Sequence, residues 1–442
     1  MTTTAIPLTT EGAAVAIRDA SFPAPFVSGL EYGPPARGPW NIVHTGMLIP
    51  ESHQVFVCAQ GCLRGVVLTA AEMGAMDRFH TVAIREENVT DGVLEDFLIE
   101  GVADLVRRIK PRPRAVLVYT SCIHHFTGCD LNLVFRELRS RFPEVDFTDC
   151  YMTPILRKTL SMDALMRRQL YSLLKPAPLQ EKTVNFIGDN VAHADSCDLI
   201  DMLRAGGWTV RDIRDCRTYD EYQQMASSAV NISTNVFGRV AGETLEKRLG
   251  QRFFYLPVSY EYDEIRSELQ TLARELSLPL PDLQQAEARA EAALAATQVL
   301  YGDTPLTVDV TATQRPLSLT KLLLQHGFNV ITVYGDSFNK EDRPAFDWLQ
   351  ANAPGLTVSA TVQAKMGLLP HTMAQQYDGK LVAIGQKGAW FTGTSYFVNL
   401  LEDGGEWGFD GIVNLCRMLA DALAAPKNTR EIIQVKGWGC CC

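Results

Sequence analysis

The sequence predicts an α/β fold of three consecutive Rossmann-like domains, each a doubly wound parallel sheet. Apolar runs rich in Val and Ile recur along the chain, and a turn and an amphipathic helical pattern follow most of them. Continuous apolar strands alternating with helices are typical of parallel sheets covered on both faces. The 442 residues also exceed what one hydrophobic core holds, since cores stop growing at roughly 250–300 residues.

The strand and helix patterns fall into three groups, which we assign to residues 1–181, 182–302 and 303–442. An Ala- and Glu-rich helix is predicted within 279–301, either as a bridge between the second and third domains or as one more surface helix. The other predicted strands, each with any helix that follows it, are 54–61, 114–122 with 130–142, 182–190 with 196–208, 229–234 with 239–250, 306–313 with 317–328, 329–337, and 380–387.

Charge and targeting signals exclude several classes of protein. The net charge of −10 argues against nucleic acid as the main partner. The first residues lack the basic and apolar regions of a signal peptide, and no run reaches the ~18 apolar residues that span a bilayer. We therefore expect a soluble, cytoplasmic protein without a membrane partner. Its 11 cysteines are then expected to be metal ligands, reactive thiols or buried residues rather than disulfides.

Two cysteines follow predicted strands of the first domain, where ligands of parallel α/β sheets bind. Cys62 comes after "QVFVCAQG" and Cys122 after "AVLVYTS". Thiolates at two strand ends of one domain could converge on a metal or an iron–sulfur cluster. Cys58 and Cys129 flank the same loops and are further candidates. Because so few ligands cannot fill a cluster's coordination shell, a second chain is expected to supply the rest.

Other thiols and two histidines have less specific interpretations. His124 and His125 adjoin Cys122 and could either hydrogen-bond cluster sulfur or simply begin a helix. The terminal run Cys440–Cys442 could ligate metal, contact a neighbouring subunit, or form a solvated tail. The remaining cysteines are expected to be small buried residues: Cys150, Cys197, Cys216 and Cys416.

Four stretches resemble the component 1 proteins of the nitrogenase superfamily: "VFVCAQGCLRGVV", "REENVTDG", "VYTSCIHHFTGCDL" and "GEWGFDGIVNL". The resemblance extends over nearly the whole chain and includes the three-domain plan. It implies the nitrogenase component 1 fold and an α₂β₂ heterotetramer of homologous subunits. It also implies a P-cluster-like [8Fe–7S] or [4Fe–4S] iron–sulfur cluster between subunits, with Cys62 and Cys122 as ligands. A homodimer of this chain is the alternative to the heterotetramer.

The sequence departs from the family pattern at two places. The family's earliest cysteine ligand is absent, and either Cys58 or Ser28 takes that role, or this chain supplies fewer ligands. Where the catalytic subunit has a cysteine in its second domain, this chain has Ser233 and Thr234. The stretch directly before "GFDG", "SYFVNLLEDGGEW", lacks the histidine that the catalytic subunit has in its third domain. The chain therefore resembles the β-like partner of the catalytic subunit. We assign no catalytic general acid or base to it.

The resemblance also implies a reaction and its partners. The amino-acid sequence of residues 31–62 looks closer to that of the methylthio-alkane reductases, which cleave C–S bonds, than to that of the dinitrogen-reducing enzymes. No nucleotide-binding motif occurs, so a separate ATP-dependent [4Fe–4S] reductase protein would supply electrons. The chain would relay them to a metallocluster in the α-like subunit. Alternatives are a scaffold for metallocluster assembly, a tetrapyrrole reductase subunit, a ligand-binding module without redox chemistry, or a thiol enzyme.

Overall fold

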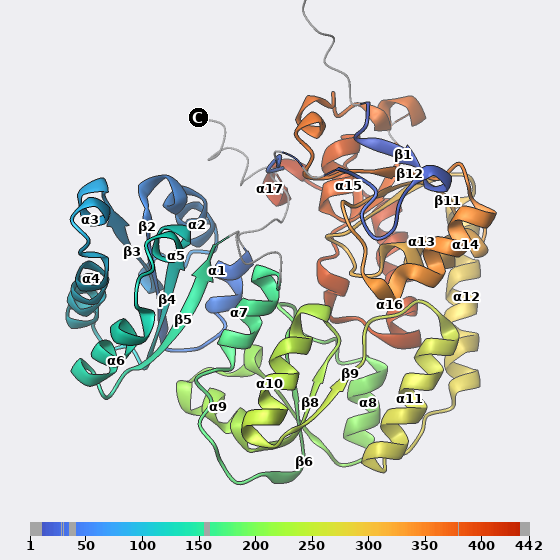
Figure 1. Cartoon of the computed structure of the whole chain (residues 1–442). Helices are drawn as coiled ribbons and strands as arrows, with labels where there is room; N and C mark the ends of the chain where they lie inside the picture. The colour runs from blue at the N-terminus through green and yellow to red at the C-terminus, as the bar shows by residue number, and fades with distance from the viewer. Residues whose placement is uncertain are drawn as a thin grey trace, which may run out of the picture. The chain divides into compact units, whose positions relative to one another are not determined.

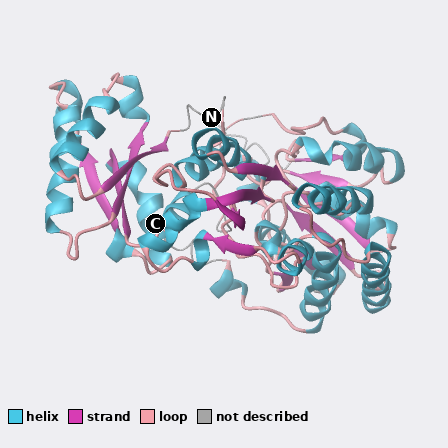
Figure 2. Ribbon diagram, turned by 90° about the horizontal axis from the view of Figure 1, so that it is seen from below, coloured by secondary structure: helices cyan, strands magenta, loops and turns pink. Residues whose placement is uncertain are grey.

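Fourteen strands form three sheets in the computed structural model, which describes residues 11–27, 29, 31–34, 41–153, 160–378 and 380–433 (Figure 1). Contacts divide the chain into two compact units. The first, here called the N-terminal unit, comprises Pro39–Asn190 and Trp208–Pro257. The C-terminal unit comprises Met1–Gly38, Val191–Gly207 and Val258–Cys442. Figure 2 shows helices on both faces of the strands, and this α/β arrangement of Rossmann-like units confirms the predicted fold class.

The first sheet has the order β3-β2-β4-β5, with all neighbours parallel. Its residues alternate between two apolar clusters, because successive side chains of a strand point to opposite faces. Val55 and Val57 pack with helices on one face, and Phe56 and Cys58 on the other. The elements are α1 Asn41–Gly46, β2 Ser52–Ala59, α2 Gln60–Glu72, β3 Phe79–Ile84, α3 Glu86–Thr90, α4 Leu94–Arg108, β4 Ala115–Ser121, α5 Cys122–Phe126, α6 Leu131–Arg141, β5 Asp146–Met152 and α7 Met162–Leu170.

The second sheet, also in the N-terminal unit, has the order β7-β6-β8-β9 and is parallel throughout. Its interior contains a polar ladder, in which the Asn185 amide donates to Asn231 at 2.8 Å and the Asn231 amide to Gln251 at 3.0 Å. These buried amides satisfy one another, as buried polar groups must. The elements are β6 Gln180–Phe186, β7 Thr209–Asp212, α9 Tyr219–Gln224, β8 Ser228–Ser233, α10 Arg239–Leu249 and β9 Arg252–Tyr255.

The third sheet, in the C-terminal unit, has the order β1-β12-β11-β10-β13-β14. Its strands are parallel except β1, which pairs antiparallel with β12 through Val15 opposite Val358. The elements are β1 Ala14–Ala16, α8 Asp198–Ala205, α11 Tyr262–Leu276, α12 Leu283–Tyr301, β10 Pro305–Asp309, α13 Pro316–Gln325, β11 Asn329–Tyr334, α14 Arg343–Asn352, β12 Thr357–Ser359, β13 Val382–Ile384, α15 Gln386–Thr392, β14 Tyr396–Val398, α16 Gly408–Ala424 and α17 Thr429–Ile432.

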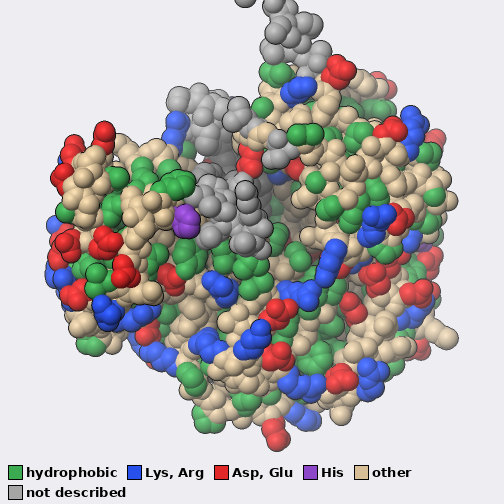
Figure 3. All heavy atoms as spheres, in the orientation of Figure 1, with side chains coloured by type: hydrophobic (Ala, Val, Ile, Leu, Met, Phe, Trp, Pro, Cys, Tyr) green, Lys and Arg blue, Asp and Glu red, His purple; other side chains and the backbone are tan. Residues whose placement is uncertain are grey.

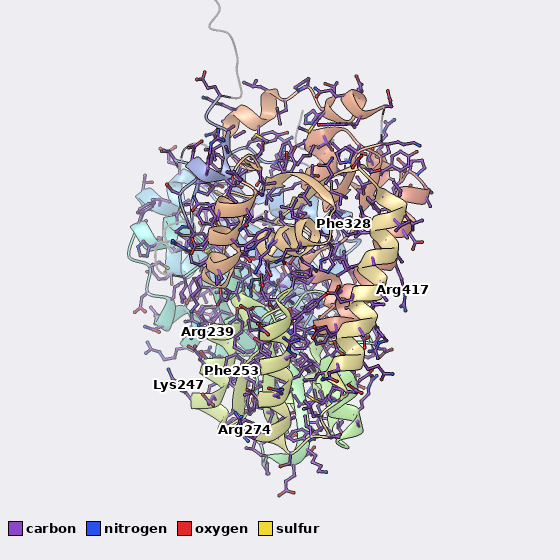
Figure 4. The ribbon with its side chains drawn as sticks, turned by 90° about the vertical axis from the view of Figure 1, so that its right-hand side faces the viewer. Arg239, Lys247, Phe253, Arg274, Phe328 and Arg417 are labelled. Atoms are coloured by element: carbon purple, nitrogen blue, oxygen red, sulfur yellow. The ribbon has the colours of Figure 1, made fainter. Side chains whose placement is uncertain are left out.

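The predicted Ala- and Glu-rich helix is α12, which packs along α16 in the C-terminal unit. Small residues on its buried face, such as Ala286 and Ala290, permit this close contact. At its last turn, the Tyr301 hydroxyl donates to the Leu419 carbonyl at 2.8 Å, and the Tyr301 ring meets Phe328. Figure 4 labels Phe328. Its role as a bridge between the second and third domains stays a prediction, as do the three domain boundaries.

The surface carries acidic and basic side chains interspersed with one another (Figure 3). This pattern accords with a net charge of −10 from 51 acidic and 41 basic residues. Every helix in the described part of the chain is too short or too polar to cross a bilayer.

A buried carboxylate makes the stability of the C-terminal unit depend on pH. The carboxylate of Asp198 accepts the Asp410 backbone N–H at 3.0 Å at the start of α16, and burial raises the pKa of Asp198 to about 7. Unfolded aspartate has a pKa near ~3.9. The native state thus retains a proton that the unfolded state has lost, so the free energy of unfolding falls as the pH rises from about 4 to about 7.

Substituting Asp198 tests this pH dependence. In Asp198→Asn, the fall in the free energy of unfolding across this pH range is expected to be smaller than in the wild type, because the amide does not titrate. Urea unfolding at pH 4.5 and pH 7.5, roughly the ends of the window, measures it. Equal falls in the two proteins would contradict the assignment.

Candidate functional site

The candidate site lies at the carboxyl edge of the first sheet, where β2 and β4 run side by side. Val57 of β2 is in register with Thr120 of β4, and each strand passes directly into a helix. Cys58 is the penultimate residue of β2, Cys62 lies in the first turn of α2, and Cys122 is the first residue of α5. Two neighbouring strand ends therefore bring these residues to one edge.

The thiols of Cys58, Cys62 and Cys122 lie close enough to influence one another. Burial raises the pKa of Cys58 to about 12, and the neighbouring Cys62 and Cys122 add to the increase. Burial and Cys122 also raise the pKa of Cys62. Because the thiolate is the metal-binding form, metal binding here must release protons. The structure thus brings together the three cysteines that the sequence predicts as the principal ligands.

The Ser121 hydroxyl is a further component of this edge. It lies near the Cys58 thiol and opposes the rise in its pKa. A polar hydroxyl beside a thiol favours the thiolate, which is the metal-binding form. The sequence alone does not single out Ser121, because a serine before a short helix is ordinarily read as a cap.

The remaining ligand candidates do not join this group. Cys129 interacts with Glu95 instead, and burial together with that carboxylate raises the pKa of Cys129 to about 12. Ser28 and the run Cys440–Cys442 lie outside the described residues. The predicted core cysteines are buried or half-buried: Cys150, Cys197, Cys216 and Cys416.

His124 caps α5 from within its first turn. Its Nδ1 accepts the Ser121 backbone N–H at 3.2 Å, and burial lowers the pKa of the ring. His124 therefore contributes to the start of a helix, which is one of the two roles that the sequence leaves open for it. The neighbouring Phe126 is 74% exposed.

In the described part of the chain, no three His, Cys, Asp or Glu side chains are placed to hold one metal ion. Cluster thiolates need not meet at one point, since each can bind a different iron. A side chain added at Gly61, next to Cys62, would project into open space, so there is room for a bulky group at this edge.

The corresponding edge of the second sheet is closed by packing. Ser233, at the end of β8, is fully buried, and its hydroxyl donates to the Asn235 carbonyl at 3.0 Å. A Cβ added at Gly238 would come within 2.2 Å of the Ser233 hydroxyl oxygen, so the backbone is pressed against this side chain. The Ser233 side chain therefore packs inside the protein and hydrogen-bonds to the backbone, so it is not placed to bind a ligand.

Parallel Rossmann-like sheets with thiols gathered at a strand edge define an α/β protein with a candidate thiolate metal centre. Residues 43–424 match the family described as nitrogenase component 1 type oxidoreductase, and the chain belongs to that family. It is therefore an oxidoreductase-family protein.

Solved structures show the same fold. One, described as nitrogenase Cp1 at pH 6.5, aligns with a TM-score of 0.64 and 14% identity over 90% of this chain and 94% of that one. A second, described as nitrogenase Cp1 at pH 5, aligns with a TM-score of 0.56 and 14% identity over 95% of this chain and 96% of that one. No curated protein matches the sequence significantly.

Gly61 gives a test of whether a bulky group occupies this edge. Gly61→Ala is expected to stabilise the metal-free chain by about 0.5–1 kcal/mol, because alanine favours the helix. The same substitution is expected to lower the iron content, because the added methyl group occupies the open space. Urea unfolding and iron analysis measure the two effects. Unchanged iron content would mean that the group binds elsewhere.

Proposed function

We propose that this chain is the β-like subunit of a nitrogenase-like reductase and holds an iron–sulfur cluster shared with a partner subunit. The observation that carries the proposal is the gathering of Cys58, Cys62 and Cys122 at two adjacent strand ends. These three are the proposed ligands, with Cys129 and Ser28 as lesser candidates. The cluster is P-cluster-like [8Fe–7S] or [4Fe–4S], and when bound it supplies one-electron transfer.

The residues around the thiols would tune the group they hold. Burial of Cys58 places one sulfur in a low-dielectric environment, and the nearby Ser121 hydroxyl favours its thiolate form. Burial and hydrogen bonds to sulfur are the means by which proteins set cluster potentials. Cys62 and Cys122 are half-exposed, which suits ligation of a group that a second subunit also contacts.

Two features favour an electron relay over a catalytic subunit. Ser233 is committed to internal packing at the position where the resemblance leads one to expect a catalytic-cluster ligand. The sequence also lacks a nucleotide motif, so an ATP-dependent [4Fe–4S] protein would dock transiently and supply the electrons. The active-site metallocluster would then lie in a homologous α-like subunit of an α₂β₂ assembly in the cytoplasm.

The proposed reaction is reductive cleavage of a methylthio-alkane. The C–S bond takes up an electron pair and two protons, and it yields methanethiol and an alkane. The test combines the anaerobically purified complex with its reductase protein, ATP and ethyl methyl sulfide, and measures methanethiol and ethane. ATP-dependent product formation that requires this chain supports the proposal. Cluster transfer from this chain to another protein without turnover would support an assembly scaffold instead.

A further inference from the structure

A pair of histidines joins two strands at the amino ends of the first sheet, opposite the edge that carries the thiols. His53 is the second residue of β2, and His80 is the second residue of β3. Val55 is in register with His80, and residues two apart in a strand share a face, so both imidazole rings lie on one face of the sheet. The His53 Nδ1 atom lies 2.8 Å from the His80 Nε2 atom. The two strands are thus connected through these side chains as well as through the backbone ladder.

The two rings meet edge to edge in a hydrogen bond. Their planes are 17° apart, and the 5.1 Å between the centroids is close to the largest separation that nitrogens in hydrogen-bond contact allow. A bond between two ring nitrogens needs one nitrogen that carries a hydrogen and one that does not. The pair is therefore either neutral or carries one positive charge. A second positive charge would place a hydrogen on the accepting nitrogen and remove the bond.

Burial and a neighbouring cation oppose protonation of the pair. Burial lowers the pKa of His53 to about 4, and His80 and Arg78 add to this decrease, whereas Asp77 opposes it. Burial also lowers the pKa of His80, again against Asp77. The Arg78 guanidinium is fixed in place, because its Nε donates to the Ser52 carbonyl at 2.8 Å. A permanent cation thus acts on the two titratable rings.

The other elements that pack on this face contribute apolar side chains. β4 has Val116 opposite His53, and α4 covers the face with Val106, which belongs to the same apolar cluster. Within the described residues, the fixed charges that act on the rings are those of Asp77 and Arg78, directly before β3. One carboxylate cannot offset the three positive charges that Arg78 and two protonated rings would present.

We propose that the His53–His80 pair is an acid-sensitive latch between β2 and β3. At neutral pH, the bond ties the amino ends of the two strands together. When both rings are protonated, the bond is lost and the two imidazolium groups repel each other, so β3, the edge strand of the first sheet, is released at this end. The latch lies at the opposite end of β2 from the thiols and needs no bound cluster. It therefore stands or falls independently of the proposed redox function.

The latch makes the N-terminal unit less stable in acid. The pKa of unfolded histidine is about 6.5, whereas that of folded His53 is about 4. The unfolded state therefore binds more protons between these values, and the free energy of unfolding falls as the pH falls through this window. Because the His53 ring is only half-buried, we expect the unfolding equilibrium constant to rise by about tenfold from pH 7.5 to about pH 5.

The experiment compares urea unfolding of the anaerobically purified full chain with that of the double variant His53→Gln/His80→Gln, at pH 7.5 and pH 5. Glutamine does not titrate, so the double variant is expected to lose this tenfold rise. The buried Asp198 acts in both proteins alike, and its effect cancels in the comparison. The matched control is His125→Gln, which removes an exposed histidine of α5 and should keep the wild-type pH dependence.

NMR of isotope-labelled histidine in the wild-type chain gives a second measurement that requires no variant to fold. At most one ring of the pair is expected to be protonated at pH 5, whereas an unperturbed histidine, with a pKa near ~6.5, is protonated there. Circular dichroism establishes that each variant is folded before it is unfolded in urea. Protonation of both rings at pH 5 in the folded wild type, or an equal response to acid in the wild type and the folded double variant, would overturn the proposal.

Discussion

Replacing both Cys62 and Cys122 with alanine is expected to abolish iron–sulfur cluster binding. The two residues lie at the ends of adjacent strands, and the charge of one raises the pKa of the other, so they are placed to hold one group. Of the three principal ligands, the double variant retains only Cys58, which is fully buried in β2. Iron and acid-labile sulfide per chain, measured after anaerobic purification, give the result directly.

The matched control for this experiment is Cys216→Ala. Cys216 is a half-buried thiol of the same unit that follows β7 of the second sheet, and its sulfur donates to the Asp212 carbonyl at 3.4 Å. Its loss is expected to leave the iron content unchanged. If the double variant keeps its full iron content while Cys216→Ala loses iron, the ligand assignment is wrong.

The second large effect concerns stability and involves Arg315. Its Nε donates to the Asp342 carboxylate at 2.9 Å, and both side chains are almost completely buried. Burial raises the pKa of Asp342 to about 6, and the positive charge of Arg315 limits this rise because it stabilises the carboxylate. Arg315→Met leaves that carboxylate buried without its cation, which is expected to cost about 3–5 kcal/mol. Urea unfolding of the full chain measures the loss.

The control is Arg343→Met, which removes an arginine from the exposed pair with Asp347 on α14. Exposed pairs of this kind contribute at most about 1 kcal/mol. The two variants therefore compare the same chemical change in buried and exposed surroundings. A similar, small loss in both would contradict the view that the buried pair supports the C-terminal unit.

Much of the fold could be predicted because its determinants are local in sequence. The run "AVLVYTS" is fully buried as β4, since both faces of a parallel strand meet helices. The ends of β2 and β4 were predictable for the same reason, and with them the location of Cys62 and Cys122. The structure adds that the three thiols influence one another, which spacing alone could not show.

Other features depend on contacts between distant residues, which no local pattern encodes. Strand β1 pairs with β12 across more than three hundred residues of sequence, and its three residues carry no strand signal of their own. The buried pairing of Arg315 with Asp342 likewise joins the residues directly before α13 and α14, which lie 27 positions apart in the sequence.

The central claim is that this chain carries an iron–sulfur cluster at the edge formed by β2 and β4. The most direct measurement is iron and acid-labile sulfide per chain in protein purified anaerobically with its native partner subunits, together with EPR spectra of reduced and oxidised samples. The account predicts several iron atoms and sulfides per chain and an EPR signal that changes with redox state. Protein that is folded, associated with its partners and free of iron would contradict it.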